Sequence, residues 1–236
     1  MDQTRLITDR SCRTGKAPLA SRFDAQLVKM ADVIPMHLRE YGKNAVVCSE
    51  GQIATHYYRV VAGAVRACTH MRDGRRQIAA FYLPGDVFGI ERGAVHRLSA
   101  EVTRRGIVAT YPRCSLNEPT YIARPQVYEM LESALIAMEL AQRHIVLLSH
   151  RDAYERIASF LIDLSDRLRR DVIELPMPRI DIADHLGLTI ETVSRMFAQL
   201  ERAGLIDLPA PRTAVLRDKA ELRRLQDGRH SQRLGV

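Results

Sequence analysis

The chain has 236 residues, of which 46% are hydrophobic and 27% are charged, so it is long and apolar enough to bury a core of its own. This composition excludes a disordered chain, a collagen-like chain and a small disulfide-stapled protein. The 35 Lys and Arg residues outnumber the 28 Asp and Glu residues, and the net charge of +7 favours a polyanionic partner such as nucleic acid.

The cysteines and the start of the chain favour a reduced, cytoplasmic protein. No C-x-x-C pair occurs, which argues against a zinc knuckle, a redox dithiol or a secreted disulfide framework. We expect small buried thiols, and exposure is the alternative for Cys12 because it lies in the predicted mobile arm; the four cysteines are Cys12, Cys48, Cys68 and Cys114. No signal peptide or membrane-length apolar run occurs. The eight histidines lack ligand spacing, so we expect no metal, haem or other cofactor.

The first half of the chain predicts a polar arm followed by an antiparallel β domain. Residues 1–22 are polar and predict a mobile arm, and residues 23–124 predict a β-barrel domain. Short runs rich in β-branched and aromatic residues, separated by turn residues, predict its strands. These runs are residues 45–48, 57–61, 63–68, 77–83 and 106–111. Asp73-Gly74 is the strongest hairpin signal among them.

Residues 125–151 predict a long helix with a dimerisation seam. Apolar residues alternate at spacings of four and three for about three heptads. They are Val127, Leu131, Ala134, Met138, Ala141, Ile145 and Leu148. A helix of roughly 25 residues is about 38 Å long, which is longer than one small domain needs for its own core. The stripe therefore predicts a parallel homodimer, and the alternative is a helix packed only against the barrel.

Residues 152–225 predict a winged helix-turn-helix domain, with the helix-turn-helix itself at residues 179–198. Gly187 permits the tight turn between the two helices, and Thr189 is a good N-cap for the second helix. Apolar residues of the second helix are expected to face the core; they are Ile190, Val193, Phe197 and Leu200. Residues 204–208 and 214–216 predict a hairpin wing, and residues 226–236 predict a tail.

The outward residues near the start of the second helix can form hydrogen bonds with the edges of DNA bases. Arg195 can donate two hydrogen bonds to guanine, Glu191 can accept from cytosine, and Ser194 can donate or accept. Thr189, Thr192 and Arg179 are further candidate DNA contacts. The alternative is a surface salt bridge between Glu191 and Arg195, since they are four residues apart.

The charge of this domain indicates that a monomer binds DNA weakly. Residues 171–217 contain five basic and seven acidic side chains, so they form no basic patch. A dimer presents two recognition helices about 34 Å apart, which doubles the contacts and requires a palindromic site. The predicted seam and the predicted helix-turn-helix therefore support one another.

Two stretches, residues 84–89 (PGDVFG) and 181–195 (DIADHLGLTIETVSR), resemble the Crp–Fnr superfamily of bacterial transcription regulators, and the second is most similar to its Fnr and FixK branch. The resemblance implies an α+β fold: an N-terminal antiparallel β-barrel like cyclic-nucleotide-binding domains, a long dimerisation helix and a C-terminal winged helix-turn-helix. It implies a homodimeric activator that reads a TTGAT-N4-ATCAA palindrome through Glu191, Ser194 and Arg195. It also implies recruitment of RNA polymerase and control of oxygen-limited, respiratory or nitrogen-fixation genes, with the hairpin at residues 72–76 as a candidate polymerase contact.

Two departures from the superfamily bear on its signal. Members that bind cyclic nucleotides carry Gly-Glu and Arg-Ser or Arg-Thr pairs, whereas here Ile90 follows Gly89 and Leu98 separates Arg97 from Ser99. Iron–sulfur members carry clustered N-terminal cysteines, whereas Cys12 stands alone in the arm. We therefore expect neither cyclic nucleotide nor cluster. The alternatives are an effector-gated regulator whose barrel binds another small ligand and, more weakly supported, an enzyme, for which no catalytic constellation stands out.

Overall fold

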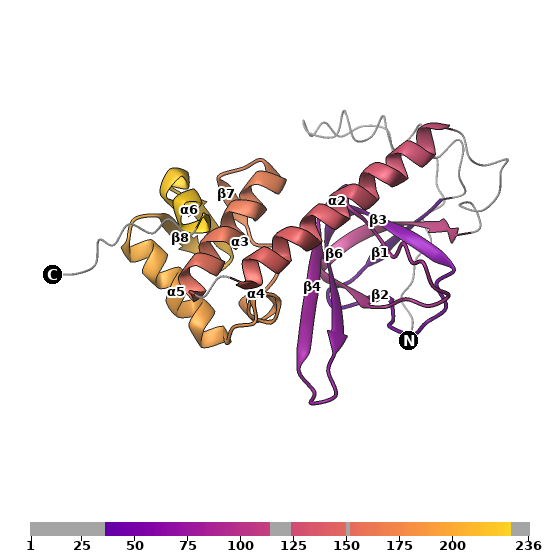
Figure 1. Ribbon diagram of the computed structural model, residues 1–236, viewed down its shortest axis with the longest axis horizontal. Helices are drawn as coiled ribbons and strands as arrows, with labels where there is room; N and C mark the ends of the chain where they lie inside the picture. Colours follow the sequence, from indigo (N-terminus) through magenta and orange to yellow (C-terminus); the bar gives the residue numbers. More distant parts are fainter. Residues whose placement is uncertain (1–35, 114–123, 150–151, 228–236) are drawn as a thin grey trace. The chain divides into compact units, whose positions relative to one another are not determined.

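The computed structural model of the chain describes residues 36–113, 124–149 and 152–227, with the side chains of the long helix described from residue 131. The described residues form two compact units (Figure 1). One contains the residues up to 69 together with 81–137, and the other contains 70–80 together with the residues from 138 onward. The predicted arm with Cys12, Cys114 and most of the predicted tail lie outside the described residues.

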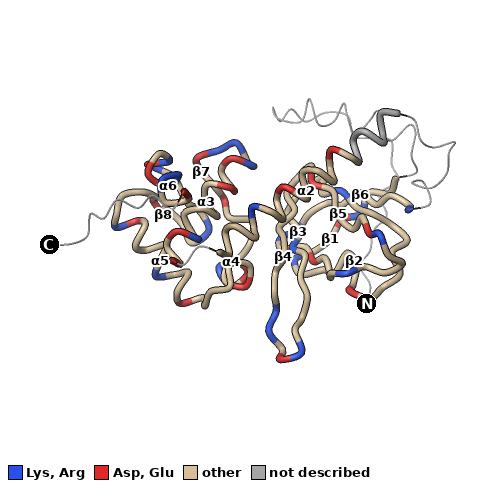
Figure 2. The backbone as a smooth tube through the Cα atoms, viewed as in Figure 1, with Lys and Arg blue, Asp and Glu red and all other residues tan. Residues whose placement is uncertain are grey.

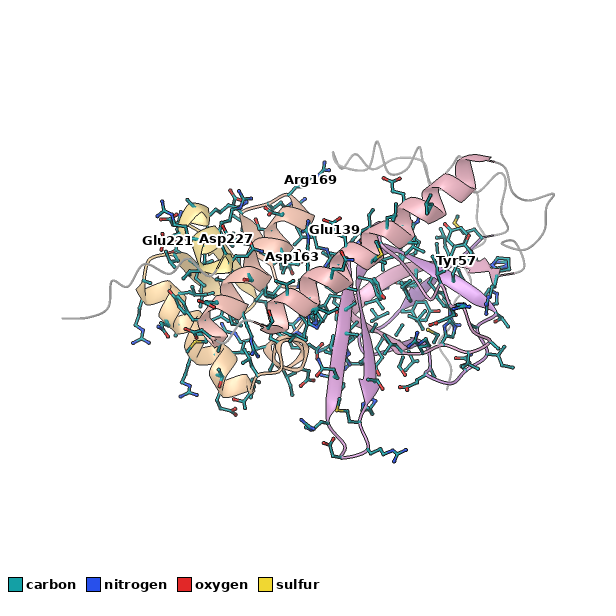
Figure 3. All side chains as sticks on the ribbon, in the orientation of Figure 1. Tyr57, Glu139, Asp163, Arg169, Glu221 and Asp227 are labelled. Atoms are coloured by element: carbon teal, nitrogen blue, oxygen red, sulfur yellow. The ribbon has the colours of Figure 1, made fainter. Side chains whose placement is uncertain are left out.

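The first unit is built on a six-stranded antiparallel sheet, as the sequence predicts, of which residues 70–80 belong to the second unit. Its main strand order is β1-β6-β3-β4, with β2 paired to β6 and β5 paired to β3. The strands are β1 (His37–Tyr41), β2 (Val46–Cys48), β3 (His56–His70), β4 (Arg76–Tyr82), β5 (Val87–Phe88) and β6 (Ser99–Pro112). Val60, Val102 and Val108 lie in its core, and Tyr57, labelled in Figure 3, stacks on Tyr111 with ring centroids 5.0 Å apart.

Strand β3 is one strand of 15 residues, so the predicted division into separate strands at residues 57–61 and 63–68 is wrong. The pairing of β3 with β6 shifts register around these residues, and Gly63 has a φ of +87°. A bulge therefore replaces the predicted turn, because glycine adopts this conformation without strain. Gly106 on β6 lies directly against the bulge, where a Cβ would overlap the carbonyl oxygen of Ala62. The sequence also missed β1 and the first half of β6.

The second unit contains the helices and a three-stranded antiparallel sheet of order β7-β9-β8. Its elements follow the long helix α2 (Arg124–Ser149), which confirms the predicted helix. They are α3 (Ala153–Leu168), β7 (Val172–Glu174), α4 (Arg179–Leu186), α5 (Ile190–Arg202), β8 (Ile206–Ala210), β9 (Thr213–Leu216) and α6 (Lys219–Gln226). Strand β7 and helix α6 were not predicted. Among the described residues, no helix has the length and apolar character to cross a membrane.

We expect Gly106→Ala to destabilise the sheet by about 1–3 kcal/mol, because the added methyl group meets the backbone of β3 and cannot be relieved by rotating a side chain. Gly42→Ala is the matched control, since a Cβ at Gly42 meets nothing within 4 Å. Urea denaturation followed by circular dichroism measures both variants. Equal stability of the two variants would contradict the close approach at the bulge.

Candidate nucleic-acid interface

The helix-turn-helix forms where the sequence predicts it. Gly187 ends α4 in the left-handed conformation with a φ of 63°, and its N–H bonds the carbonyl of Ala183. Thr189 caps α5: its hydroxyl accepts the backbone N–H of Thr192 at 3.2 Å. The cap satisfies one of the free amide groups at the start of α5. The turn and the cap together fix where the outward face of α5 begins.

One face of α5 is completely buried. The side chains of Val193, Phe197 and Leu200 are 0% exposed. Ile190 was also expected to face the core, and this prediction is wrong because Ile190 is 41% exposed. Ile190 is the first residue of the helix. It lies about one turn before Val193, the first of the three buried residues. The helix is therefore held by the other three side chains, which leaves its first turn open.

The predicted base-reading residues lie on the opposite face of α5. Glu191 and Arg195 are exposed, and Thr192 and Ser194 are half-buried. The Arg195 guanidinium donates to the Thr192 hydroxyl at 3.4 Å, and within the described residues it forms no ion pair with Glu191. Hydrogen bonds from its own backbone N–H and from the Thr189 side chain lower the pKa of Glu191, so this carboxylate is a charged acceptor at neutral pH.

Arg179, the sixth predicted DNA contact, packs against α5 instead of extending from the surface. Its guanidinium lies 4.5 Å from the centroid of the Phe197 ring, a cation–π geometry. Burial lowers the pKa of Arg179, which remains charged at neutral pH. Arg179 thus joins the start of α4 to the buried face of α5, and a role in DNA binding stays a prediction.

The strands after α5 form the predicted wing. β8 and β9 pair antiparallel, with Ala210 opposite Thr213 at the turn. Pro211 and Arg212 at the tip are exposed. Figure 2 shows acidic and basic positions interspersed along the helices of this unit, in agreement with the absence of a basic patch in its sequence. Affinity for a polyanion therefore depends on a few placed contacts.

The predicted dimer seam lies on an open face of α2. Leu131 is 54% exposed, Met138 is 53% exposed and Ile145 is 68% exposed, and Ala134 and Ala141 are exposed as well. Leu148 is half-buried, and the side chain of Val127 is outside the described residues. Sequence reasoning missed further exposed apolar residues on this helix: Leu135, Ile136 and Val146. This much uncovered apolar surface on one helix is typical of a protein interface.

The second unit also contains a group of contacts that joins residues distant in the sequence. Arg76, near the tip of the β3–β4 hairpin, pairs with Asp181 and Asp184 of α4. The His185 ring stacks on His144 of α2 with centroids 4.0 Å apart. The Arg76 pairs join residues more than 100 positions apart, and the two histidines are also distant in the sequence, so no local pattern predicts these contacts and sequence reasoning missed them.

In the first unit, the loop that follows β5 is held by its own side chains. Glu91 accepts the backbone N–H of Arg97 at 3.1 Å. The Arg113 guanidinium donates to the carbonyl oxygens of Glu91 at 2.9 Å and Gly93 at 2.6 Å. A Cβ at Gly89 would lie 2.9 Å from the Tyr58 ring. The Glu91 carboxylate and the Arg113 guanidinium are thus engaged within the unit, and the absence of a nucleotide ligand stays a prediction.

The two described cysteines are buried, as expected. Cys48 is 3% exposed and Cys68 is 0% exposed. Burial raises the pKa of the Cys48 thiol to about 11, so it is protonated and unreactive at neutral pH. Within the described ranges, no group of three His, Cys, Asp or Glu side chains is placed to hold a metal ion.

Comparison with known proteins agrees with this architecture. The cyclic nucleotide-binding domain family matches residues 38–118, and the Crp-like helix-turn-helix domain family matches residues 155–225. The nitrogen fixation regulation protein FixK of Azorhizobium caulinodans is 43% identical over 196 residues, which cover 78% of this chain and 77% of that protein. The chain belongs to the Crp–Fnr family of transcription regulators. Members of this family bind DNA and act as dimers.

Two further relatives support the assignment to the Crp–Fnr family. The transcriptional activatory protein AadR of Rhodopseudomonas palustris is 38% identical, covering 79% of this chain and 80% of AadR. The structure of FixK2 from Bradyrhizobium japonicum superposes with a TM-score of 0.76 at 39% identity, covering 81% of this chain and 98% of that one. These findings confirm the predicted family and fold, and they make the chain a transcription regulator and not an enzyme.

The stability of this Crp–Fnr protein should depend on pH through His185. Burial, with smaller effects of His144 and Arg167, lowers the pKa of His185 to about 3, from 6.5 in an unfolded chain. The unfolded state therefore binds a proton below pH 6.5 that the folded state does not bind until about pH 3. The free energy of unfolding falls as pH decreases across this window, by about 1.4 kcal/mol per pH unit from this group.

Urea denaturation at pH 7, 6 and 5 tests this prediction. The difference in stability between the wild type and His185→Gln, whose amide does not titrate, should shrink as pH decreases. His70→Gln, at an exposed site, serves as the control. Parallel loss of stability by wild type and His185→Gln over this range would show that His185 does not carry the effect.

Proposed function

We propose that this chain is a homodimeric activator that binds a TTGAT-N4-ATCAA palindrome without an effector and recruits RNA polymerase. The observation that carries the proposal is the outward, uncovered face of α5 with Glu191, Ser194 and Arg195 near its N-terminal end. The FixK relative supports a role in nitrogen fixation or oxygen-limited gene control, and the AadR relative supports activation. The proposal includes a cytoplasmic location, which a DNA target supports.

The chemistry of this face suits direct readout in the major groove. Arg195 can donate two hydrogen bonds to the O6 and N7 atoms of guanine, and Glu191 can accept from the exocyclic amine of cytosine. Both side chains are exposed, and the first three residues of α5 precede the first buried residue of the helix. The N-terminal turn of a recognition helix is the part that reaches base edges in this class of domain. We therefore assign base reading to Glu191, Ser194 and Arg195.

Dimerisation supplies the affinity that one unit lacks. The exposed apolar residues of α2 include Leu131, Met138 and Ile145, all more than half exposed. A second copy of the same helix is the natural occupant of this face, since a heptad spacing matches itself across a twofold axis. Two recognition helices then engage two half-sites, which is the reason for a palindromic target.

The tip of the β3–β4 hairpin is the proposed contact for RNA polymerase. Arg72 and Arg75 are exposed at this tip, with Asp73 between them. The charged tip is visible at the end of the long hairpin in Figure 2. Arg76, which the sequence places in the same group, is bound to α4, so we assign the contact to Arg72 and Arg75 alone.

Titration of the ligand-free protein onto the palindrome and onto a scrambled duplex, at about 150 mM salt, tests the proposal, since non-specific binding is weak there. We expect selective binding as a dimer. Equal affinity for the two duplexes would contradict effector-independent binding and direct attention to a ligand of the barrel.

Replacing Arg195 by Ala should cost about 1–3 kcal/mol on the palindrome and relax the preference at the guanine position, because two hydrogen bonds to that base are lost. Arg202→Ala is the control: Arg202 is exposed on the same helix, and its guanidinium donates to the carbonyl of Ala198. The variants are compared on the palindrome and on duplexes substituted at single positions. An equal loss on specific and random DNA for Arg195→Ala would rule out base reading by this residue.

A further inference from the structure

The orientation of the recognition helix depends on whatever holds α4. Ile182 and Leu186 of α4 and Val193 and Phe197 of α5 are all 0% exposed, so the two helices share one packed core. Well-packed cores resist relative sliding because side chains interdigitate at close to crystal density. A contact that fixes α4 therefore also fixes the outward face of α5.

Arg76 fixes one side of α4 to the β3–β4 hairpin. Its Nη2 atom lies 2.6 Å from Asp181 Oδ1 and 2.6 Å from Asp184 Oδ2, and its Nε atom lies 2.8 Å from Asp184 Oδ2. The side chain of Asp181 is only 1% exposed, and those of Arg76 and Asp184 are 21% and 24% exposed. Charge-assisted hydrogen bonds of this kind are short and directional, and removing one partner of a buried pair is costly.

His185 fixes the next part of α4 to two other elements. Its Nδ1–H donates to the carbonyl oxygen of Ile78 on β4 at 3.0 Å, since a carbonyl can only accept. Its ring stacks on His144 of α2, with an angle of 13° between the rings, and meets Phe160 of α3 edge-on. Both histidines have a lowered pKa through burial, so they stack as neutral rings.

The C-terminal part of α2 is also joined to α3. Arg143 donates to Glu139 on its own helix at 2.6 Å and to Asp163 of α3 at 3.4 Å. Glu139 and Asp163, both labelled in Figure 3, lie on the two helices that Arg143 connects. The end of the dimerisation helix, the hairpin and α4 thus meet in one set of side-chain contacts within the second unit.

We call this set of contacts the junction; its residues are Arg76, Asp181, Asp184, His144 and His185. We propose that the junction sets the angle between the recognition helix and the dimerisation helix. The junction thereby selects the spacing between half-sites. The inference rests on the proposed function. It adds to that function the structural element that determines the preferred spacer length. One base pair more or less in the spacer moves a half-site by about 3.4 Å and rotates it by about 35°. A recognition helix held by the junction cannot follow such a change.

Binding to palindromes with spacers of two to six base pairs tests the inference. The wild type should prefer the four-base-pair spacer by about tenfold or more over its neighbours, the size of effect that one mismatched position causes. Arg76→Gln and Asp184→Asn should reduce this preference to about threefold or less while keeping the discrimination between correct and substituted half-site bases. Arg224→Gln, at an exposed ion pair of α6 in the same unit, should leave both preferences unchanged.

Asp184→Asn decides the test if Arg76→Gln fails to fold, because Asp184 is the more exposed of the two carboxylates. Restored spacer preference in the exchanged pair Arg76→Asp with Asp184→Arg would add support. An unchanged spacer preference in Asp184→Asn overturns the inference. So does a parallel loss of spacer and base preference, which would indicate general damage to the domain.

Hydrogen exchange separates failure of the junction from failure of the proposed function. If the wild type does not select the palindrome, the proposed function fails, and the junction is judged by exchange without DNA. Asp184→Asn should then speed exchange in α4, in residues 76–80 and at the end of α2 together, relative to Arg224→Gln. Faster exchange confined to α4 would contradict a junction that couples the three elements.

Discussion

Burial of one face of α5 is the constraint on which the functional surface depends. Val193, Phe197 and Leu200 are completely inaccessible, so rotation of the helix about its axis would expose apolar surface at a cost of several kcal/mol. The opposite face, with Glu191, Ser194 and Arg195, is therefore directed outward whatever the protein is bound to. A face fixed in this way can discriminate bases, because the free energy of binding is not spent on ordering it.

Under the proposed function, the barrel serves as a scaffold of the dimer and senses no ligand. Its loop after β5 is closed by Glu91 on a backbone amide and by Arg113 on backbone carbonyl oxygens. Under the proposed function, the amount of protein sets its occupancy on DNA, so regulation acts on its synthesis and turnover.

Local chemistry explains which parts of the structure the sequence could predict. Three local signals predicted the helix-turn-helix correctly: Gly187 at the turn, Thr189 at the N-cap and the spacing of the buried residues of α5. Each of them depends on residues only a few positions apart in the sequence. Gly63 misled the strand prediction, because a positive φ serves a bulge as well as a turn. The bond between Arg76 and Asp181 joins residues 105 positions apart, and only the folded chain reveals it.

In the proposed dimer, the two recognition helices are already set for their half-sites before DNA or any effector is present. Spin labels at Arg202→Cys, with Cys12 and Cys114 replaced by Ser, give the distance between the two helices by pulsed electron resonance, since Cys48 and Cys68 are buried. We expect one narrow distance distribution that the palindrome leaves unchanged. A broad distribution that narrows only when DNA or a small ligand is added would contradict it.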